Sequence, residues 1–175
     1  MFWFLREPRF SLSRASAIVR TIAPGNSAIV RGANNGVGIG LVEVYDLDRA
    51  VDSKLANISS RGLVQTGDNV MIGGFILLGP DSQKVIVRGI GPSLALPGKL
   101  ADPMLQLYNG NGSKLDENDN WRSTNANEII GTGIPPTDDA ESALVEYLSP
   151  GNYTAILRGS NNATGIAVVQ VYALQ

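Results

Sequence analysis

The chain contains two copies of one segment, and this internal repeat limits what it can fold into more than any other feature. The first copy spans residues 16–47 and the second spans residues 142–174. With a one-residue insertion in the second copy, more than half of the aligned positions are identical. Such a match points to a repeated structural unit. We therefore expect the same local structure in both copies.

Each copy has the pattern of three β-strands. The first two apolar runs are separated by Pro24-Gly25 in the first copy and by Pro150-Gly151 in the second. Proline followed by glycine suits a type II turn, because glycine adopts a positive φ at little cost. The pattern therefore predicts that the first two strands form a hairpin. A second strand ending in Arg-Gly, an Asn-Asn loop and a third strand complete each copy.

The third strand alternates in character. In the second copy Val169 and Val171 flank Gln170, and Tyr172 follows. Side chains alternate between the two faces of a strand, so we expect the valines to face inward. Tyr172 is then expected on the outer face or at a rim. Residues 42–45 repeat this pattern in the first copy.

The sequence between the copies supplies the rest of a domain. Val70–Leu78 predicts a central strand that is apolar on both faces, with a bulge or a close backbone approach at Gly73-Gly74. Lys84–Ile90 predicts a strand whose valines face inward. Asn109–Gly112 predicts the turn of a hairpin. Asn125, three residues before a glutamate, predicts a capped helical turn to about residue 130.

These strands predict an all-β fold, either an immunoglobulin-like or a jelly-roll-like β-sandwich. Residues 49–175 supply seven or eight strands, which is a complete sandwich. Residues 1–48 are then a surplus three-stranded segment. Because three strands with an apolar face are not stable alone, the segment must pack on its own domain, swap into a neighbour or belong to a truncated preceding repeat.

Composition argues against several classes of function. The chain has no cysteine and no histidine, which removes thiolate chemistry, the commonest general base and the commonest metal ligand. A net charge of −2 without a basic cluster argues against nucleic acid as a partner. No transmembrane segment and no signal peptide are visible. We expect a protein without enzymatic activity.

An acidic loop is the candidate cation site. Residues 116–120 have the oxygen density of a calcium loop, although Trp121 stands where an EF-hand needs glycine. The same residues also suit turns that bond their own backbone. Trp121 itself suits either stacking on a sugar or burial in the core. The expected calcium ligands are Asp116, Asn118, Asp119, Asp138 and Asp139.

Six short segments carry a family resemblance. They are Leu55–Gly62, Thr66–Phe75, Arg88–Leu94, Leu100–Pro103, Asn118–Trp121 and Pro150–Ala155. Together they resemble a repeat module of large secreted and surface proteins of environmental bacteria. The resemblance covers residues 49–174 as one full unit and residues 16–47 as the tail of a preceding unit. It implies an extracellular or cell-surface β-sandwich used in tandem arrays, without known catalysis.

The surplus copy leads to the expected function. A donated strand supplies the main-chain hydrogen bonds that an open sheet edge lacks, and a head-to-tail contact that does not close generates a filament. We expect an extracellular structural protein that self-assembles head to tail through its N-terminal β-segment. The alternative is a calcium- or carbohydrate-binding surface adhesion module. The expected assembly residues are Ile18, Val19, Ile29, Ile39, Leu41, Val42, Val44 and Tyr45.

Overall fold

The computed structural model describes residues 16–19, 26–45 and 57–174. These residues fall into two units, one within Phe4–Val44 and the other within Tyr45–Gln175. Among the described residues, no helix is both long and apolar enough to cross a membrane.

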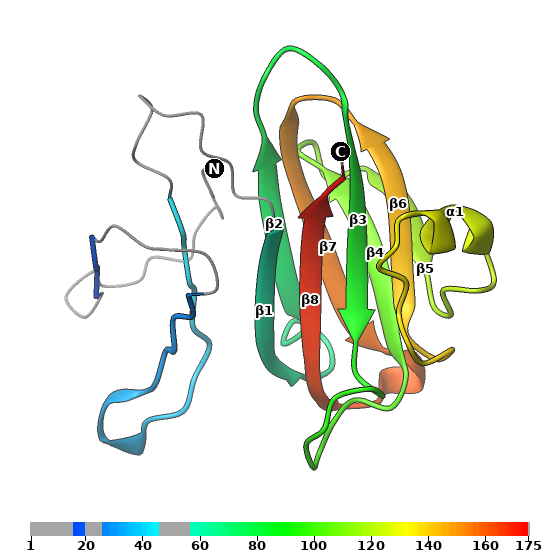
Figure 1. Cartoon of the computed structure of the whole chain (residues 1–175). Coiled ribbons are helices and arrows are strands. Elements are labelled where there is room, and N and C mark those ends of the chain that lie inside the picture. Colours follow the sequence, from blue (N-terminus) through cyan, green and yellow to red (C-terminus); the bar gives the residue numbers. More distant parts are fainter. Residues whose placement is uncertain (1–15, 20–25, 46–56, 175) are drawn as a thin grey trace. The chain divides into compact units, whose positions relative to one another are not determined.

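The regular structure of the larger unit is mostly β-strand, and Figure 1 shows the strands as two layers with one short helix beside them. The strands are β1 (Asn57–Val64), β2 (Met71–Leu77), β3 (Gln83–Ile90), β4 (Pro103–Asn109), β5 (Lys114–Asn118), β6 (Ser142–Leu148), β7 (Gly151–Gly159) and β8 (Gly165–Ala173). The helix α1 spans Ala126–Gly131, and a 3₁₀ turn, η3, spans Ser160–Asn162.

The strand order identifies the fold. One sheet has the order β1-β8-β3-β6 and the other has the order β2-β7-β4-β5, with every pairing antiparallel. The first strand therefore pairs with the last, the second with the seventh, the third with the sixth and the fourth with the fifth. Strand pairs nested in this way, as in one long hairpin wound around a core, form the jelly-roll arrangement. The predicted all-β sandwich is confirmed, and its topology is the jelly roll.

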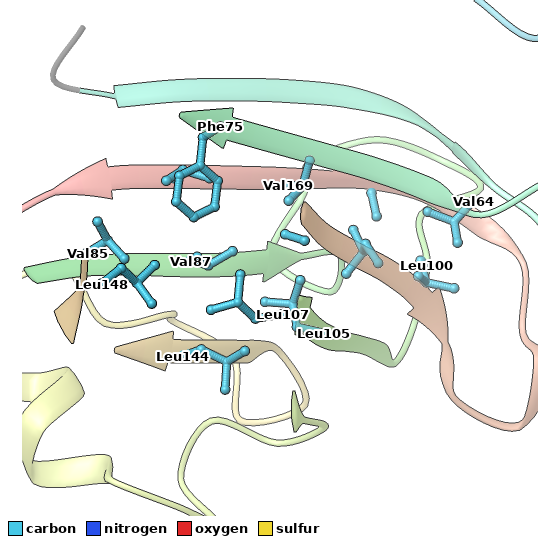
Figure 2. Close-up of a cluster of buried hydrophobic side chains, with 14 residues drawn as sticks. Val64, Phe75, Val85, Val87, Leu100, Leu105, Leu107, Leu144, Leu148 and Val169 are labelled. Atoms are coloured by element: carbon cyan, nitrogen blue, oxygen red, sulfur yellow. The ribbon is translucent and has the colours of Figure 1, made fainter. Parts of the chain in front are cut away.

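The main core lies between the two sheets. Val85 and Val87 of β3 and Val169 and Val171 of β8 all face inward, as the alternation predicted. Figure 2 shows several of these side chains packed between the layers with Phe75 of β2. Burial of such side chains removes apolar surface from water and supplies most of the drive for folding.

The close backbone approach predicted at Gly73-Gly74 is confirmed at Gly73. A Cβ atom added to Gly73 would lie 2.8 Å from a methyl group of Val169 in the opposite sheet. Glycine therefore lets β2 and β8 come together there. However, β2 is an edge strand and not a central one. An apolar run indicates burial, whereas the position of a strand across a sheet depends on pairing with distant segments.

A second, smaller core lies on the outer face of the β1-β8-β3-β6 sheet. Ile86 of β3 and Val145 of β6 point to this face and contact Trp121 and Ile129, which belong to the segment between β5 and β6. Helix α1 forms where it was predicted, but the Asn125 side chain does not cap it. Asn125 has a φ of 53°, and its backbone carbonyl accepts the Ile129 N–H at 3.0 Å.

The hairpin predicted at Pro150-Gly151 is wrong. Strand β6 pairs with β3 in one sheet, whereas β7 pairs with β2 and β4 in the other. Gly151 also does not have the positive φ of a type II turn. Proline and glycine favour a change of chain direction, but crossing between the sheets lets both strands bury their apolar faces. The equivalent turn at Pro24-Gly25 lies outside the described residues.

The three strands predicted in the first copy are not present in its described part. Residues 16–19 and 26–45 contain no strand, and the only regular element among them is a 3₁₀ turn, η2, at Ala33–Asn35. The jelly roll gives the physical reason for the missing strands. In the second copy β6, β7 and β8 do not pair with one another, and every partner strand comes from β1–β4. Without strands equivalent to β1–β4, a copy has no partners for the backbone hydrogen bonds of a sheet.

Candidate functional site

The five predicted calcium ligands divide among separate structural roles. Asn118 is buried, and its Nδ2 donates to the Asn120 carbonyl at 3.1 Å and to the Thr124 hydroxyl at 3.0 Å. Its Oδ1 accepts the Ala143 N–H at 3.1 Å. Asn118 therefore ties the end of β5 to β6. Within the described residues, no group of three or more carboxylates that could hold a metal ion occurs.

The aspartates at 138 and 139 also make local contacts. The Asp138 Oδ1 accepts the Ala140 N–H at 3.0 Å, and the Asp138 carbonyl accepts the indole N–H of Trp121 at 3.0 Å. Asp139 pairs with Arg122 on the surface. These contacts shape the loops between β5 and β6 and need no cation. Calcium binding by these residues stays a prediction.

Asp116 lies beside a carboxyl group that the sequence pattern did not pick out. It lies on β5 opposite Leu107 of β4, while Glu146 occupies the inward-facing side of β6 between Leu144 and Leu148. Burial, and then the negative charge of Asp116, raise the pKa of the Glu146 carboxyl above its usual value. Strands β5 and β6 end their sheets, so inward-pointing carboxyls protect this edge against pairing with another chain.

Asp119 has a different neighbour, Asp102, which the sequence pattern also missed. In the described part of the chain, one oxygen of each carboxyl is buried without a hydrogen-bond partner. Burial, and then the charge of Asp102, raise the pKa of the Asp119 carboxyl above its usual value. The two residues are far apart in sequence, and only the pairing of β4 with β5 places them at the same end of a sheet.

Replacing Asp119 with Asn is expected to stabilise the sandwich at neutral pH. Folding raises the pKa of Asp119, so the ionised carboxyl costs the folded state stability. This cost is absent below about pH 4, where the carboxyl is protonated in both the folded and the unfolded state. The cost grows as the pH rises through the raised folded pKa. We expect the variant to melt about 2 °C above wild type at pH 7 and at the same temperature as wild type at pH 3.

The same melts test the calcium prediction. If Asp119 binds calcium, as predicted, calcium chloride will raise the Tm of wild type and not that of Asp119→Asn. A variant that melts below wild type at pH 7 in the presence of a chelator would contradict the charge cost assigned to Asp119.

The carboxylate of Glu141 is fully buried. Its Oε1 accepts the Ser93 hydroxyl at 2.6 Å, the Ser93 N–H at 3.1 Å and the Gly91 N–H at 3.3 Å. Its Oε2 accepts the N–H groups of Thr137 at 3.2 Å and Asp138 at 3.3 Å. Five donors thus replace water around the charge. Glu141 joins the loop after β3 to the segment before β6 and has no lone pair turned to solvent.

Trp121 is part of the same assembly of loops. Its side chain is 1% exposed and contacts the second core, and its N–H donates to the Asp138 carbonyl. The Arg122 guanidinium lies 4.0 Å from the centre of its ring. The ring therefore does not present a free face for stacking on a sugar.

The first copy keeps the local geometry of the second at its loop. Asn34 in η2 has φ and ψ of 52° and 39°, and its counterpart Asn161 in η3 has 52° and 34°. Both loops are closed by a backbone bond, from the Gly36 N–H to the Ala33 carbonyl at 2.9 Å in the first copy and at 3.0 Å in the second. The repeat in sequence is therefore also a repeat in structure over these residues.

Outside the loop the two copies differ in burial. Val30 is 63% exposed, whereas its counterpart Leu157 is fully buried. Val42 is 49% exposed, whereas its counterpart Val169 is 3% exposed. Large exposed apolar groups gathered on one short segment are typical of an interaction surface. The exposed side chains in the first copy are Ile18, Val19, Ile29, Val30, Val37, Ile39, Leu41, Val42 and Tyr45.

The counterparts in the second copy refine the predicted assembly residues. Val42 and Val44 correspond to inward-facing valines, whereas Ile29 and Ile39 correspond to Ile156 and Ile166, which are only partly buried. Val30 was missed. In a run of adjacent apolar residues, alternation alone does not say which of them faces the core.

No family model matches the chain, and no curated protein sequence matches it.

Proposed function

We propose that this protein is a non-catalytic structural module that joins other units of its own kind end to end through the first copy. Repeated contacts of this kind build a filament, and we place the protein outside the cell or on its surface. The observation that supports the proposal is the contrast between the two copies. Apolar positions that are buried in the second copy are exposed in the first.

A receiving surface for the segment is the β1/β2 side of another copy. Strands β1 and β2 each end a sheet, so among the described strands their outer backbone groups have no ladder partner. Leu63 on β1 is 59% exposed, and Ile72 on β2 is also exposed. The opposite edge carries the inward carboxyls of Asp116 and Glu146. An extended apolar segment is therefore attracted to the first edge and repelled by the second.

Replacing Val30 with Asp is expected to abolish self-association of the full chain. A charge at this position opposes its burial in any partner. Sedimentation velocity over a hundredfold range of concentration should show wild type growing into larger species while the variant stays monomeric. The Tm of the sandwich should be unchanged, because Val30 lies outside it.

Val37 provides the matched control. Val37→Asp introduces the same charge at an exposed position of the same segment, but the counterpart of Val37 in the second copy, Thr164, is exposed in the sandwich. We expect the first copy to turn toward its partner the same face that the second copy buries, so this variant should associate like wild type. A wild-type chain that stays monomeric at the highest concentration would overturn the proposal. Equal loss of self-association in both variants would show that nonspecific hydrophobic contacts, and not the repeat, drive association.

A further inference from the structure

We infer that the described part of the first copy, residues 16–19 and 26–45, is a donor for the β6, β7 and β8 positions of a second jelly-roll unit. Its partner is a core equivalent to β1–β5 of this chain in which those three positions are empty. The inference rests on the proposed function, because the partner is a unit of the same kind, and it goes further by naming the part of that unit that is bound.

The shape of the β7 position fits the first copy. Leu157 fills space that Gly89 of β3 leaves open, since a Cβ atom added to Gly89 would lie 2.5 Å from a methyl carbon of Leu157. Val30 occupies the matching place in the first copy and is smaller than leucine. It therefore enters the same space without a clash, leaving a small gap. In the same way Val42 matches Val169, which packs against Gly73.

A glycine shared by the two copies fits the β8 position. Gly165 of β8 lies so close to the loop before β4 that an added Cβ atom would be 2.6 Å from the Leu100 nitrogen. The first copy has Gly38 at this position, yet nothing lies within 4 Å of a Cβ atom added there, and its φ is not positive. No close contact in the described structure therefore requires glycine at residue 38. The β8 position does require it, because a side chain at Gly165 would clash with the backbone at Leu100.

The numbers of donors and acceptors point to the kind of partner. The described residues contain two donors, the first copy and residues 142–173, but only one set of strands β1–β5. If one identical chain inserted its first copy into another, a second copy would be released for each first copy buried. Such an exchange gives no net burial, so identical chains are left with the sheet edges. A core whose three positions are empty gives the full burial.

The test weakens the chain's own β7 so that its positions become available. In the full chain, Leu157→Asp should still give a cooperative thermal transition, because a first copy replaces the disabled strands. Adding Val30→Asp should remove that transition, whereas adding Val37→Asp should leave it unchanged. If Leu157→Asp has no transition, or if Val30→Asp and Val37→Asp change it equally, the inference is wrong.

A cross-link in a milder background keeps the test decisive. The chain has no cysteine, so Ile29→Cys and Gln106→Cys can be introduced together with Leu157→Ala. Gln106 of β4 stands opposite Ile156, the counterpart of Ile29, so Ile156→Cys with Gln106→Cys is the positive reference. We expect an efficient disulfide for Ile29→Cys and at least a tenfold lower yield for the register-shifted pair Val30→Cys with Gln106→Cys.

The outcomes separate this inference from the proposed function. Strand β4 lies between β7 and β5, so a segment that only adds to the β1/β2 edge does not reach Gln106. Association that Val30→Asp abolishes, without the disulfide, would overturn the donor role and leave the proposed function standing. The disulfide without association of wild type would support the donor role and overturn head-to-tail assembly of identical chains.

Discussion

Glu141→Gln is expected to lower the free energy of unfolding by about 3 to 5 kcal/mol, although it changes one atom. The buried carboxylate accepts hydrogen bonds on both oxygens, from Gly91 and Ser93 on one side and from Thr137 and Asp138 on the other. A glutamine side chain has one acceptor and one donor. Its NH₂ group would face two or more donors, which would lose their partners in a dry environment.

Chemical denaturation followed by circular dichroism measures this effect, and the Tm should fall by about 10 °C. Glu117→Gln is the matched control, since Glu117 lies on the exposed side of β5 and pairs only with Lys114 and Gln106 at the surface. That substitution should leave the stability almost unchanged, because exposed ion pairs contribute little. Equal effects of the two substitutions would contradict the role given to Glu141.

Trp121→Ala is expected to lower the free energy of unfolding by about 3 to 5 kcal/mol, because it empties the centre of the second core. The indole contacts the outer face of β3 and β6 and holds the loop of Asp138 through its N–H. Loss of that face should loosen the segment between β5 and β6, including α1. Hydrogen exchange should therefore increase there before it increases in β7 or β8.

Tyr147→Ala is the control for Trp121, since Tyr147 is a large aromatic residue of β6 that is 68% exposed. Its loss should change the Tm by no more than about 2 °C. If Trp121→Ala left the stability unchanged but removed binding to a carbohydrate, the core role would be wrong and the adhesion alternative would gain support.

Local patterns predicted much of this molecule. The alternation in β3 and β8, the hairpin of β4 and β5 and the position of α1 all follow from residues close together in sequence. The carboxylate pairs were not predictable in this way. Asp102 meets Asp119, and Asp116 meets Glu146, only because strands distant in sequence meet at the ends and edges of the sheets.

The five expected calcium ligands illustrate the same limit. Oxygen-rich loops have the same composition whether they bind a cation or bond their own backbone, and Asn118 shows the second outcome. The hydrogen bonds to the Glu141 carboxylate could not be predicted from neighbouring residues alone. Some of its donors are close to it in sequence, but others lie about 50 residues away.

By itself the sequence determined that one segment occurs twice, that both copies share an Asn-Asn loop, and that the fold is built from strands. It also determined which faces of those strands are apolar, because alternation is a property of neighbouring residues. Only the tertiary structure decided that β6, β7 and β8 lie in two different sheets and pair with β1–β4 and never with each other. Pairing over long distances supplies the backbone partners of this repeat, so its first copy, which has the same sequence pattern, stays without strands in the described residues.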